Sequence, residues 1–329
     1  MENNRITLSI IVPSFNTSKY VNECLPSFFD ERLIGKVKIY LIDDGSTDNT
    51  ATTIEPYIKK YPDYFEYYHK ENGGHGSVIN FGVFNLIKSK YFKVVDGDDW
   101  VDTEELIKLV TALEQLDDDM IICDYTQVYP DRTVYVCCKR TKERFEPDFL
   151  SLLITIHSVT YKTSLFLDND IKMREKVFYE DNEFRLFPLE FVKSYKYLPF
   201  NVYQYRMGTT SQSISLISQI RHKKDSDTII SDLLDRYSIL KKNNANVSLV
   251  ELYEKILARF FVNDYLFLYF ALKSKKEIKS NIKNLEARTN RFVAIKNYML
   301  EHEKRYVFLK KMNFGPIFMM KIIFRKKLH

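Results

Sequence analysis

Residues 91–100 read YFKVVDGDDW, and this stretch is the strongest indication of the fold. A strand-like, mainly apolar segment, residues 91–95, ends abruptly in the carboxylates of Asp96, Asp98 and Asp99. Carboxylates crowded this closely repel one another unless a cation lies among them. Because open α/β sheets bind ligands at the carboxyl ends of their strands, the first hypothesis is a Mg²⁺ or Mn²⁺ ion that bridges these carboxylates and a diphosphate. Taken alone, such a cluster is equally typical of a helix N-cap or a solvated turn.

Strand and helix patterns alternate along residues 1–125. Apolar runs bounded by polar turns predict strands, and segments with helical signals lie between them. Repeated β-α-β units of this kind fold into a mainly parallel sheet covered by helices. The predicted strands are residues 7–12, 37–42, 65–69, 91–95 and 120–125, and the predicted helices are residues 19–29, 48–60, the segment after the glycine turn to about 88, and 102–116.

Three other predicted strands also lead into polar turns. Residues 13–16 (PSFN) follow the first strand, residues 43–48 (DDGSTD) the second, and residues 72–76 (NGGHG) the third. The carboxyl ends of parallel strands meet at one edge of a sheet, so these turns are expected to line one crevice with residues 96–99. An acidic residue after the second strand suits a hydrogen bond to a base or ribose, and the glycine turn allows close approach of the backbone to a nucleotide.

The sequence lacks two common phosphate-binding loops. Neither G-x-G-x-x-G nor G-x-x-x-x-G-K-[ST] occurs, so a dinucleotide fold and a P-loop enzyme are both disfavoured. A nucleotidyltransferase would need a basic, glycine-rich loop near the first strand, and residues 13–16 do not supply one.

The rhythm of the sequence changes after residue 125. Residues 133–139 predict a strand outside the alternation, and residues 150–215 mix short apolar runs with polar loops. From about residue 216 the pattern is helical, with an interruption at residues 243–246. We therefore predict a catalytic domain over residues 1–215, divided at about residue 125 into a nucleotide-sugar half and an acceptor half, and a C-terminal helical domain over residues 216–329.

The charge of the chain is unevenly distributed. Residues 221–329 hold 24 Lys and Arg against 11 Asp and Glu, a net charge of +13, and the residues before them hold 25 against 33, a net charge of −8. A basic C-terminal part indicates an anionic partner surface. No nucleic-acid-binding motif accompanies the charge, so a nucleic acid is not the expected partner.

Three further features indicate a cytoplasmic protein. Its four cysteines have neither metal-ligand nor disulfide-framework spacing and are expected to be reduced thiols. No signal-peptide pattern precedes the first strand. The most apolar stretch, residues 256–272, contains Arg259, Asn263 and Asp264 and predicts a buried helix rather than a membrane span.

At the strand-end motifs the chain resembles the family 2 glycosyltransferases of the GT-A fold, which are inverting and nucleotide-sugar dependent. The resemblance covers about residues 6–215, and several motifs occur in the family's order. They are residues 9–16 (SIIVPSFN), 43–48 (DDGSTD), 72–76 (NGGHG), 96–99 (DGDD), 179–181 (YED), 205–206 (YR) and 211–213 (SQS).

The resemblance implies the residues that bind the nucleoside. Pro13 and Phe15 correspond to its backbone and ring contacts, Asp44 to the carboxylate that reads the uracil edge, and Asn72 to a further base or ribose contact. Asp43 beside Asp44 has an alternative interpretation, because the turn is also a good helix start in which one of the two acids only caps.

It also implies the residues that act on the diphosphate and the acceptor. Asp96 and Gly97 belong to the nucleotide-sugar site, and Asp98 corresponds to the direct ligand of a Mn²⁺ or Mg²⁺ ion. Asp99 is expected to support this ligand or to cap. Asp181 corresponds to the general base that takes the proton from the acceptor hydroxyl; as an alternative, it is an acid at the start of a helix.

The resemblance also implies contacts to the nucleotide-sugar for Arg206, Ser211 and Ser213. These residues correspond to a mobile segment that binds the pyrophosphate. One departure concerns the helix after the glycine turn, where many relatives have an Arg-Asn pair. Here Asn80 matches the Asn, but Ile79 stands in the Arg position.

The charge on the diphosphate must then be met elsewhere, and the candidates are Arg206, Lys70 and His75. His157, Cys137 and Cys138 are interpreted as structural.

The function that follows is metal-dependent transfer of a sugar, with inversion, from a UDP-sugar to a hydroxyl of a cell-surface glycan. The expected acceptors are a capsule or exopolysaccharide unit on a lipid carrier, teichoic acid, or a glycoprotein adhesin. The alternative is a non-catalytic nucleotide-sugar-binding subunit of a glycosyltransferase complex. The basic, apolar residues 304–327 predict either peripheral binding to the inner, anionic face of the membrane, or a helix that packs on the catalytic domain or in a homo-oligomer.

Overall fold

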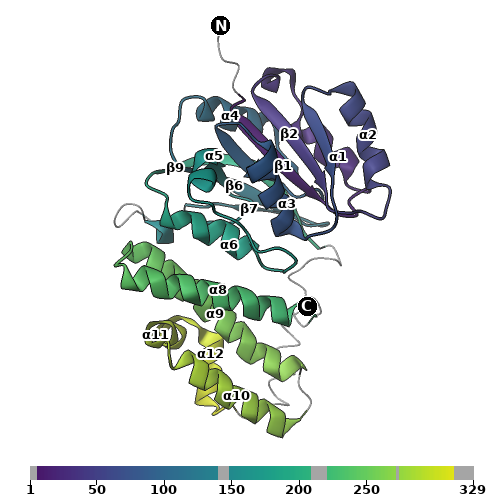
Figure 1. Cartoon of the computed structure of the whole chain (residues 1–329). Coiled ribbons are helices and arrows are strands. Elements are labelled where there is room, and N and C mark those ends of the chain that lie inside the picture. The colour runs from purple at the N-terminus through teal and green to yellow at the C-terminus, as the bar shows by residue number, and fades with distance from the viewer. Residues whose placement is uncertain (1–5, 140–147, 209–220, 272–273, 315–329) are drawn as a thin grey trace. The chain divides into compact units, whose positions relative to one another are not determined.

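The computed structural model of the chain describes residues 6–139, 148–208, 221–271 and 274–314, and Figure 1 shows its course. The chain forms two compact units, residues 1–212 and residues 213–329, and each is described by itself. The first contains a mixed sheet with helices on both faces, and the second is helical. These features confirm the predicted α/β class of GT-A type and the C-terminal helical region.

The sheet of the first unit is ordered β3-β2-β1-β4-β8-β6-β9-β5, with β7 paired to β6. Strands β1 to β4 pair in parallel, as the alternating pattern predicts. The strands are β1 (Leu8–Ser14), β2 (Val37–Asp43), β3 (Phe65–His69), β4 (Tyr91–Val94), β5 (Trp100–Val101), β6 (Met120–Val128), β7 (Thr133–Val136), β8 (Val159–Lys162) and β9 (Tyr195–Arg206).

The fifth predicted strand forms, as β6, but it does not lie beside β4. The short strand β8 is inserted between them and is antiparallel to both. β6 instead pairs in parallel with the long strand β9 and antiparallel with β7, the strand predicted outside the alternation. This arrangement matters for the site, because it brings the loop before β8 and the end of β9 beside the end of β4.

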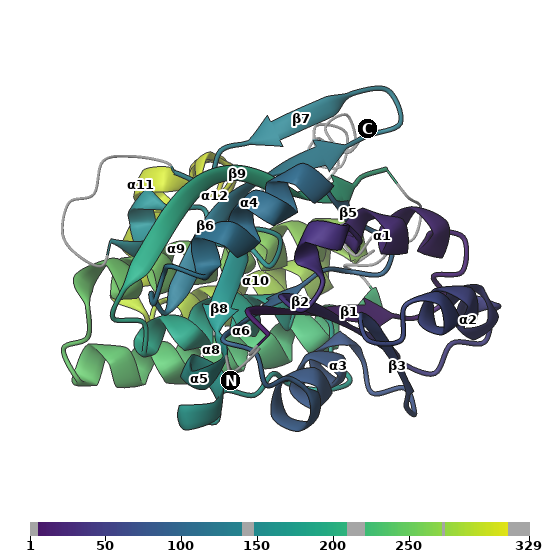
Figure 2. The same ribbon diagram turned by 90° about the horizontal axis from the view of Figure 1, so that it is seen from above.

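The central strands are buried on both faces. β1 is buried along its whole length, and Ile10, Ile11 and Val12 have no exposed surface. In Figure 2, α1 and α4 lie on one side of the sheet and α3 and α5 on the other. A continuous apolar run is what a strand covered on both faces requires. The helices of this unit are α1 (Val21–Phe28), α2 (Thr50–Lys60), α3 (His75–Phe81), α4 (Thr103–Leu113), α5 (Thr163–Asp168) and α6 (Asp181–Leu186).

The second unit is built around α9 (Val247–Ala271), which contacts each of the other helices that the structure describes in this unit. Tyr253 and Tyr265 on α9 are completely buried, as the apolar pattern predicts. Asp264, one of its polar interruptions, is buried against Lys223 at 3.0 Å. Within the described residues, no helix has both the length and the apolar character needed to cross a bilayer. The other helices are α8 (Lys223–Lys242), α10 (Lys275–Thr289), α11 (Val293–His302) and α12 (Lys304–Lys311).

Candidate active site

The carboxyl ends of the parallel strands surround a cavity of about 460 Å³. It is formed by the turns after β1, β2 and β4 and by the start of α3. Five of the residues predicted to bind the nucleotide-sugar or the metal line it: Pro13, Phe15, Asp44, Asp96 and Asp98. The full lining is Pro13, Ser14, Phe15, Asn16, Thr17, Lys19, Tyr20, Asp44, His75, Val78, Asp96 and Asp98.

The turn after β4 is pressed against the end of β1. The backbone N–H of Gly97 donates to the carbonyl oxygen of Pro13 at 2.9 Å. A Cβ atom at Gly97 would lie 2.8 Å from Oγ of Ser14 and 2.9 Å from the carbonyl oxygen of Pro13. Only glycine fits this approach, so Gly97 shapes the cavity without lining it.

Asp99 does not line the cavity and is 1% exposed. Its carboxylate accepts hydrogen bonds from the Tyr203 hydroxyl at 2.7 Å and from the backbone N–H of Arg206 at 2.8 Å. The Tyr203 hydroxyl in turn accepts from the backbone N–H of Asp96 at 3.1 Å. Asp99 therefore fixes the acidic turn to β9.

The three carboxylates of this turn differ in pKa because their surroundings differ. Burial and the charge of Asp96 raise the pKa of Asp98 from its ordinary value of 3.8 to about 6. Burial, together with Asp98 and Asp96, raises the pKa of Asp99 well above that value. Burial also acts to raise the pKa of Asp96, but the positive charge of His75 outweighs it and lowers that pKa. Crowded acids with raised pKa values are what a cation site without its cation is expected to contain.

His75 lies between Asp96 and Glu180. Its Nε2 lies 2.9 Å from Oδ1 of Asp96, and its Nδ1 lies 2.9 Å from Oε1 of Glu180. Burial acts to lower the pKa of His75, but the two carboxylates reverse this and raise it well above its ordinary value.

Asp44 is held by the glycine turn. Its Oδ1 accepts from Nζ of Lys70 at 2.7 Å and from the N–H of Gly73 at 2.9 Å, and its Oδ2 accepts from the N–H of Gly74 at 2.8 Å. Nδ2 of Asn72 donates to the backbone carbonyl of Asp44 at 2.8 Å. The structure thus brings Asp44 and Asn72 together, and Lys70 is already paired with a protein carboxylate.

Arg206 lies at the end of β9 between two aromatic rings. Its guanidinium carbon is 4.7 Å from the Trp100 ring centre and 4.8 Å from that of Tyr20. Its Nε donates to the backbone carbonyl of Asp98 at 2.8 Å, and its terminal nitrogen pairs with Glu23 at 2.5 Å. Arg206 therefore supports the turn that carries Asp98. Ser211 and Ser213, the other predicted grip residues, lie outside the described part of the chain.

Asp181, the predicted base, is the first residue of α6, and its Oδ1 accepts from Nδ2 of Asn182 at 3.0 Å. Burial raises the pKa of its carboxyl, while the positive charge of Arg185 offsets part of the effect. Tyr179, two residues before it, has a φ of 75°, which is unfavourable for an aromatic residue. Such a backbone conformation persists only where the surroundings impose it, so the start of α6 is held in a specific position.

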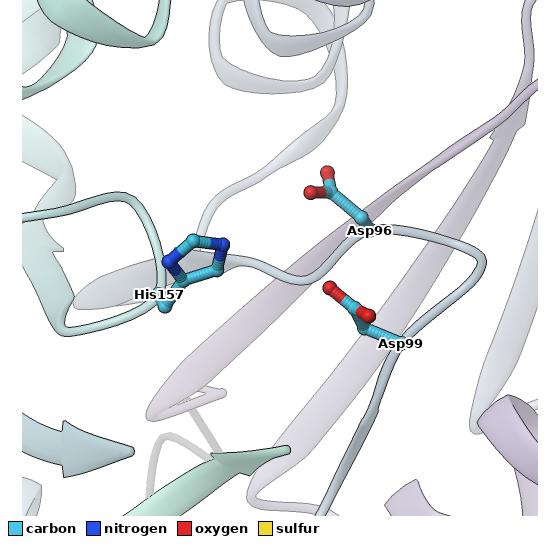
Figure 3. A group of neighbouring side chains, drawn as sticks. All are labelled: Asp96, Asp99 and His157. Carbon is cyan, nitrogen blue, oxygen red and sulfur yellow. The ribbon is translucent and has the colours of Figure 1, made fainter. Parts of the chain in front are cut away.

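Among the described residues, one group could hold a metal ion. Ligand atoms of Asp96, Asp99 and His157 all lie within 4.8 Å of one another, and Figure 3 shows the imidazole facing the two carboxylates. Burial lowers the pKa of His157 to about 4, so its ring is neutral, and its buried Nδ1 has no hydrogen-bond partner. Carboxylate oxygens with a neutral imidazole suit Mn²⁺ or Mg²⁺. Asp98, the predicted ligand, is not in this group, although it lines the cavity.

The position of His157 could not be read from the sequence. It precedes β8, and its carbonyl accepts from Nζ of Lys93 at 2.8 Å. Lys93 is buried in β4, where burial lowers its pKa to about 8. The His157 ring stacks on Tyr205 with 4.1 Å between ring centres. The one local signal was a lysine inside an apolar strand, which indicates a buried polar contact.

Comparison with known proteins agrees with this geometry. Residues 9–187, which include the cavity lining and Asp181, match the sequence family described as Glycosyl transferase family 2. The chain belongs to this family. The predicted family is thereby confirmed.

Relatives in this family have glycosyltransferase names. The uncharacterized glycosyltransferase EpsJ of Bacillus subtilis (strain 168) is 27% identical over 221 residues, which are 62% of this chain and 62% of that protein. Glycosyltransferase GlyG of Streptococcus pneumoniae serotype 4 is 31% identical over 119 residues, 36% of this chain and 38% of GlyG. These matches cover less than two thirds of each relative's length.

Solved structures share the fold at low identity. TarS of S. aureus, residues 1–349 in complex with UDP-GlcNAc, has a TM-score of 0.62 and 20% identity over 85% of this chain and 80% of that one. The mannosyltransferase PcManGT of Pyrobaculum calidifontis, in complex with GDP-Man and Mn²⁺, has a TM-score of 0.56 and 12% identity over 94% and 87% of the two chains. At these identities the likeness establishes the fold alone.

Proposed function

We propose that the chain is a metal-dependent, inverting glycosyltransferase that moves a sugar from a UDP-sugar to a hydroxyl of a cell-surface glycan. The observation that carries the proposal is that Phe15, Asp44, Asp96 and Asp98, from three different strand ends, line one cavity. The exposed ring of Phe15, with 51% of its surface accessible, suits stacking on a base. Asp44 suits hydrogen bonding to the base edge.

The ligands of a divalent cation would be Asp96, Asp99 and His157. Asp98 is the further ligand that the family resemblance implies. A bound Mn²⁺ or Mg²⁺ ion would act as a Lewis acid toward the negative charge that develops on the diphosphate. TarS in complex with UDP-GlcNAc and PcManGT in complex with GDP-Man and Mn²⁺ share this fold, which supports a nucleotide-sugar and a metal for this chain.

Asp181 would take the proton from the acceptor hydroxyl. A positioned general base contributes about 10²–10⁴-fold to a rate. Displacement at the face opposite to the leaving diphosphate inverts the anomeric centre, so a UDP-α-sugar gives a β-linkage. The raised pKa of Asp181 makes it a better proton acceptor than an exposed aspartate.

The acceptor and the location follow from the family resemblance and the charge distribution. A capsule or exopolysaccharide unit on a lipid carrier, teichoic acid, or a glycoprotein adhesin fits the resemblance. The net charge of +13 over residues 221–329 supports an anionic acceptor, or peripheral binding to the cytoplasmic face of the membrane.

The test is release of UDP from a panel of UDP-sugars, with GDP-mannose included, in the presence of Mn²⁺, Mg²⁺ or a chelator. We expect metal-dependent release from one UDP-sugar and its loss in Asp98→Ala and Asp181→Ala. Full activity in both variants would overturn the site assignment. Binding of UDP and Mn²⁺ without turnover of any donor would favour the alternative, a nucleotide-sugar-binding subunit.

A further inference from the structure

His75 connects two parts of the site that lie on separate segments of the chain. Its Nε2 contacts Asp96 in the donor cavity, and its Nδ1 contacts Glu180, the residue before the proposed base. Both distances are 2.9 Å, and the two carboxylates come from positions 21 and 105 residues away in sequence. Both contacts are within hydrogen-bonding distance.

The backbone around His75 is fixed by close packing. The N–H of Lys176 donates to the carbonyl oxygen of Gly73 at 2.7 Å, so the segment before α6 is tied to the glycine turn. A Cβ atom at Gly76 would lie 2.2 Å from the carbonyl oxygen of Arg174 and 3.2 Å from Cγ of Glu180. Glycine at this position allows the turn and the segment before α6 to meet, and His75 is placed between Asp96 and Glu180 as a result.

Two other cations near the cavity, Lys70 and Arg206, have different partners. Nζ of Lys70 is bonded to Asp44 and to Oγ of Ser77, and the Arg206 guanidinium is bonded to the Asp98 carbonyl and Glu23. Three cations are candidates to meet the charge of the diphosphate: Lys70, His75 and Arg206. Of these three, His75 is the one that lines the cavity.

We infer that His75 is a positioning residue that ties the donor carboxylate Asp96 to Glu180 and so fixes the start of α6 with its base, Asp181. The inference rests on the proposed function. It assigns to His75 a connection between the two halves of the site, beyond any charge that it offers to the donor diphosphate.

Kinetics and binding distinguish this role from simple charge donation. A misplaced base lowers kcat, whereas a missing diphosphate contact weakens donor binding. For His75→Gln and Glu180→Gln we expect kcat to fall by about 10–100-fold. The Kd of UDP with Mn²⁺, measured by calorimetry, should stay within about threefold.

The double variant tests whether the two residues act as one connection. If they do, His75→Gln with Glu180→Gln is no slower than the worse single variant, because residues of one network are not additive. His302→Gln, an exposed histidine of the second unit, serves as the matched control and should leave kcat and Kd unchanged.

Hydrogen exchange supplies a readout that needs no turnover. Amides of residues 178–186 should exchange faster in His75→Gln than in the wild-type chain, while those of β1 and β2 should not change. Unchanged exchange in 178–186, wild-type kcat, or a loss of UDP affinity at unchanged kcat would each overturn the inference. Failure of the wild-type chain to turn over any donor would overturn the proposed function instead, and the exchange comparison would still decide the role of His75.

Discussion

Asp98 in the sheet unit and Glu286 in the helical unit are both partly buried carboxylates, but they have opposite surroundings. Glu286 accepts from the hydroxyls of Tyr265 at 2.6 Å and Tyr306 at 2.8 Å and from Nζ of Lys296 at 2.9 Å. Burial acts to raise its pKa, but these donors reverse the effect and lower it. At Asp98, burial and Asp96 raise the pKa to about 6, and Arg206 and His75 offset only part of this.

The difference separates a carboxylate that stabilises the fold from one that is held ready for a ligand. A carboxylate whose oxygens are fully supplied with hydrogen-bond donors lowers the free energy of the folded state. A crowded one raises it until a cation arrives, which proteins tolerate at functional sites. The predictions below test this comparison.

The largest expected effect is at the proposed base. Asp181→Asn removes the proton acceptor but keeps the size of the side chain, so turnover of the UDP-sugar should fall by about 10²–10⁴-fold. Binding of UDP with Mn²⁺ should persist in calorimetry. Asp63→Asn, at an exposed aspartate of the same unit, is the control and should retain wild-type turnover. An active Asp181→Asn variant would show that the base is another residue.

The next effect concerns the helical unit. Glu286→Ala leaves the buried Tyr306 hydroxyl without its acceptor and the Tyr265 hydroxyl with only the longer 3.4 Å contact to Thr289. It should lower the free energy of unfolding by about 2–4 kcal/mol. Urea denaturation followed by circular dichroism measures it. Glu301→Ala, at an exposed position of the same unit, should cost little. A Glu286→Ala variant as stable as wild type would mean that this network does not hold the unit together.

Asp98→Asn should have the opposite effect and raise the free energy of unfolding of the metal-free chain. The folded-state pKa of Asp98, about 6, is raised above its ordinary value of 3.8, so ionising this group destabilises the metal-free fold. The penalty is absent below about pH 4, develops as pH rises to about 6, and is complete above it. Asp98→Asn should therefore stabilise the metal-free chain by about 1–3 kcal/mol at pH 7.5 and by almost nothing at pH 4.

Thermal denaturation at the two pH values, with and without Mn²⁺, checks this prediction. Mn²⁺ should raise the melting temperature of the wild-type chain more than that of Asp98→Asn, because a ligand stabilises the state that binds it. If Asp98→Asn were destabilised at pH 7.5, Asp98 would belong with Glu286 as a structural carboxylate.

Much of the donor side of the site could be predicted from the sequence because its residues are local to strand ends. Asp44, Asp96 and Asp98 each follow an apolar run, and parallel pairing of those runs is enough to bring them together. The insertion of β8 between β4 and β6 could not be predicted, since a four-residue strand carries little periodicity and its pairing depends on residues far away in sequence.

The contacts that complete the site depend on that insertion and on other long-range packing. His157 reaches Asp96 and Asp99 because β8 lies beside β4, and His75 meets Glu180 across 105 residues. Arg206 was expected to grip the diphosphate, and the structure places it between Tyr20 and Trp100, where it supports the Asp98 turn. A side chain's partners follow from tertiary packing, which no local pattern contains.

The smallest expected effects are at two helix N-caps, one in each unit. At these positions the two units should not differ in kind. The carboxylate of Asp102 accepts from the N–H of Glu105 at 3.0 Å at the start of α4, and the hydroxyl of Ser274 accepts from the N–H of Glu277 at 3.5 Å at the start of α10. Asp102→Ala should cost about 1 kcal/mol and Ser274→Ala less, because its hydrogen bond is longer. Urea denaturation measures both, and neither variant should alter the Kd of UDP with Mn²⁺. A change in that Kd for Asp102→Ala would mean that α4 also positions the acidic turn, since Asp102 lies only three residues after Asp99.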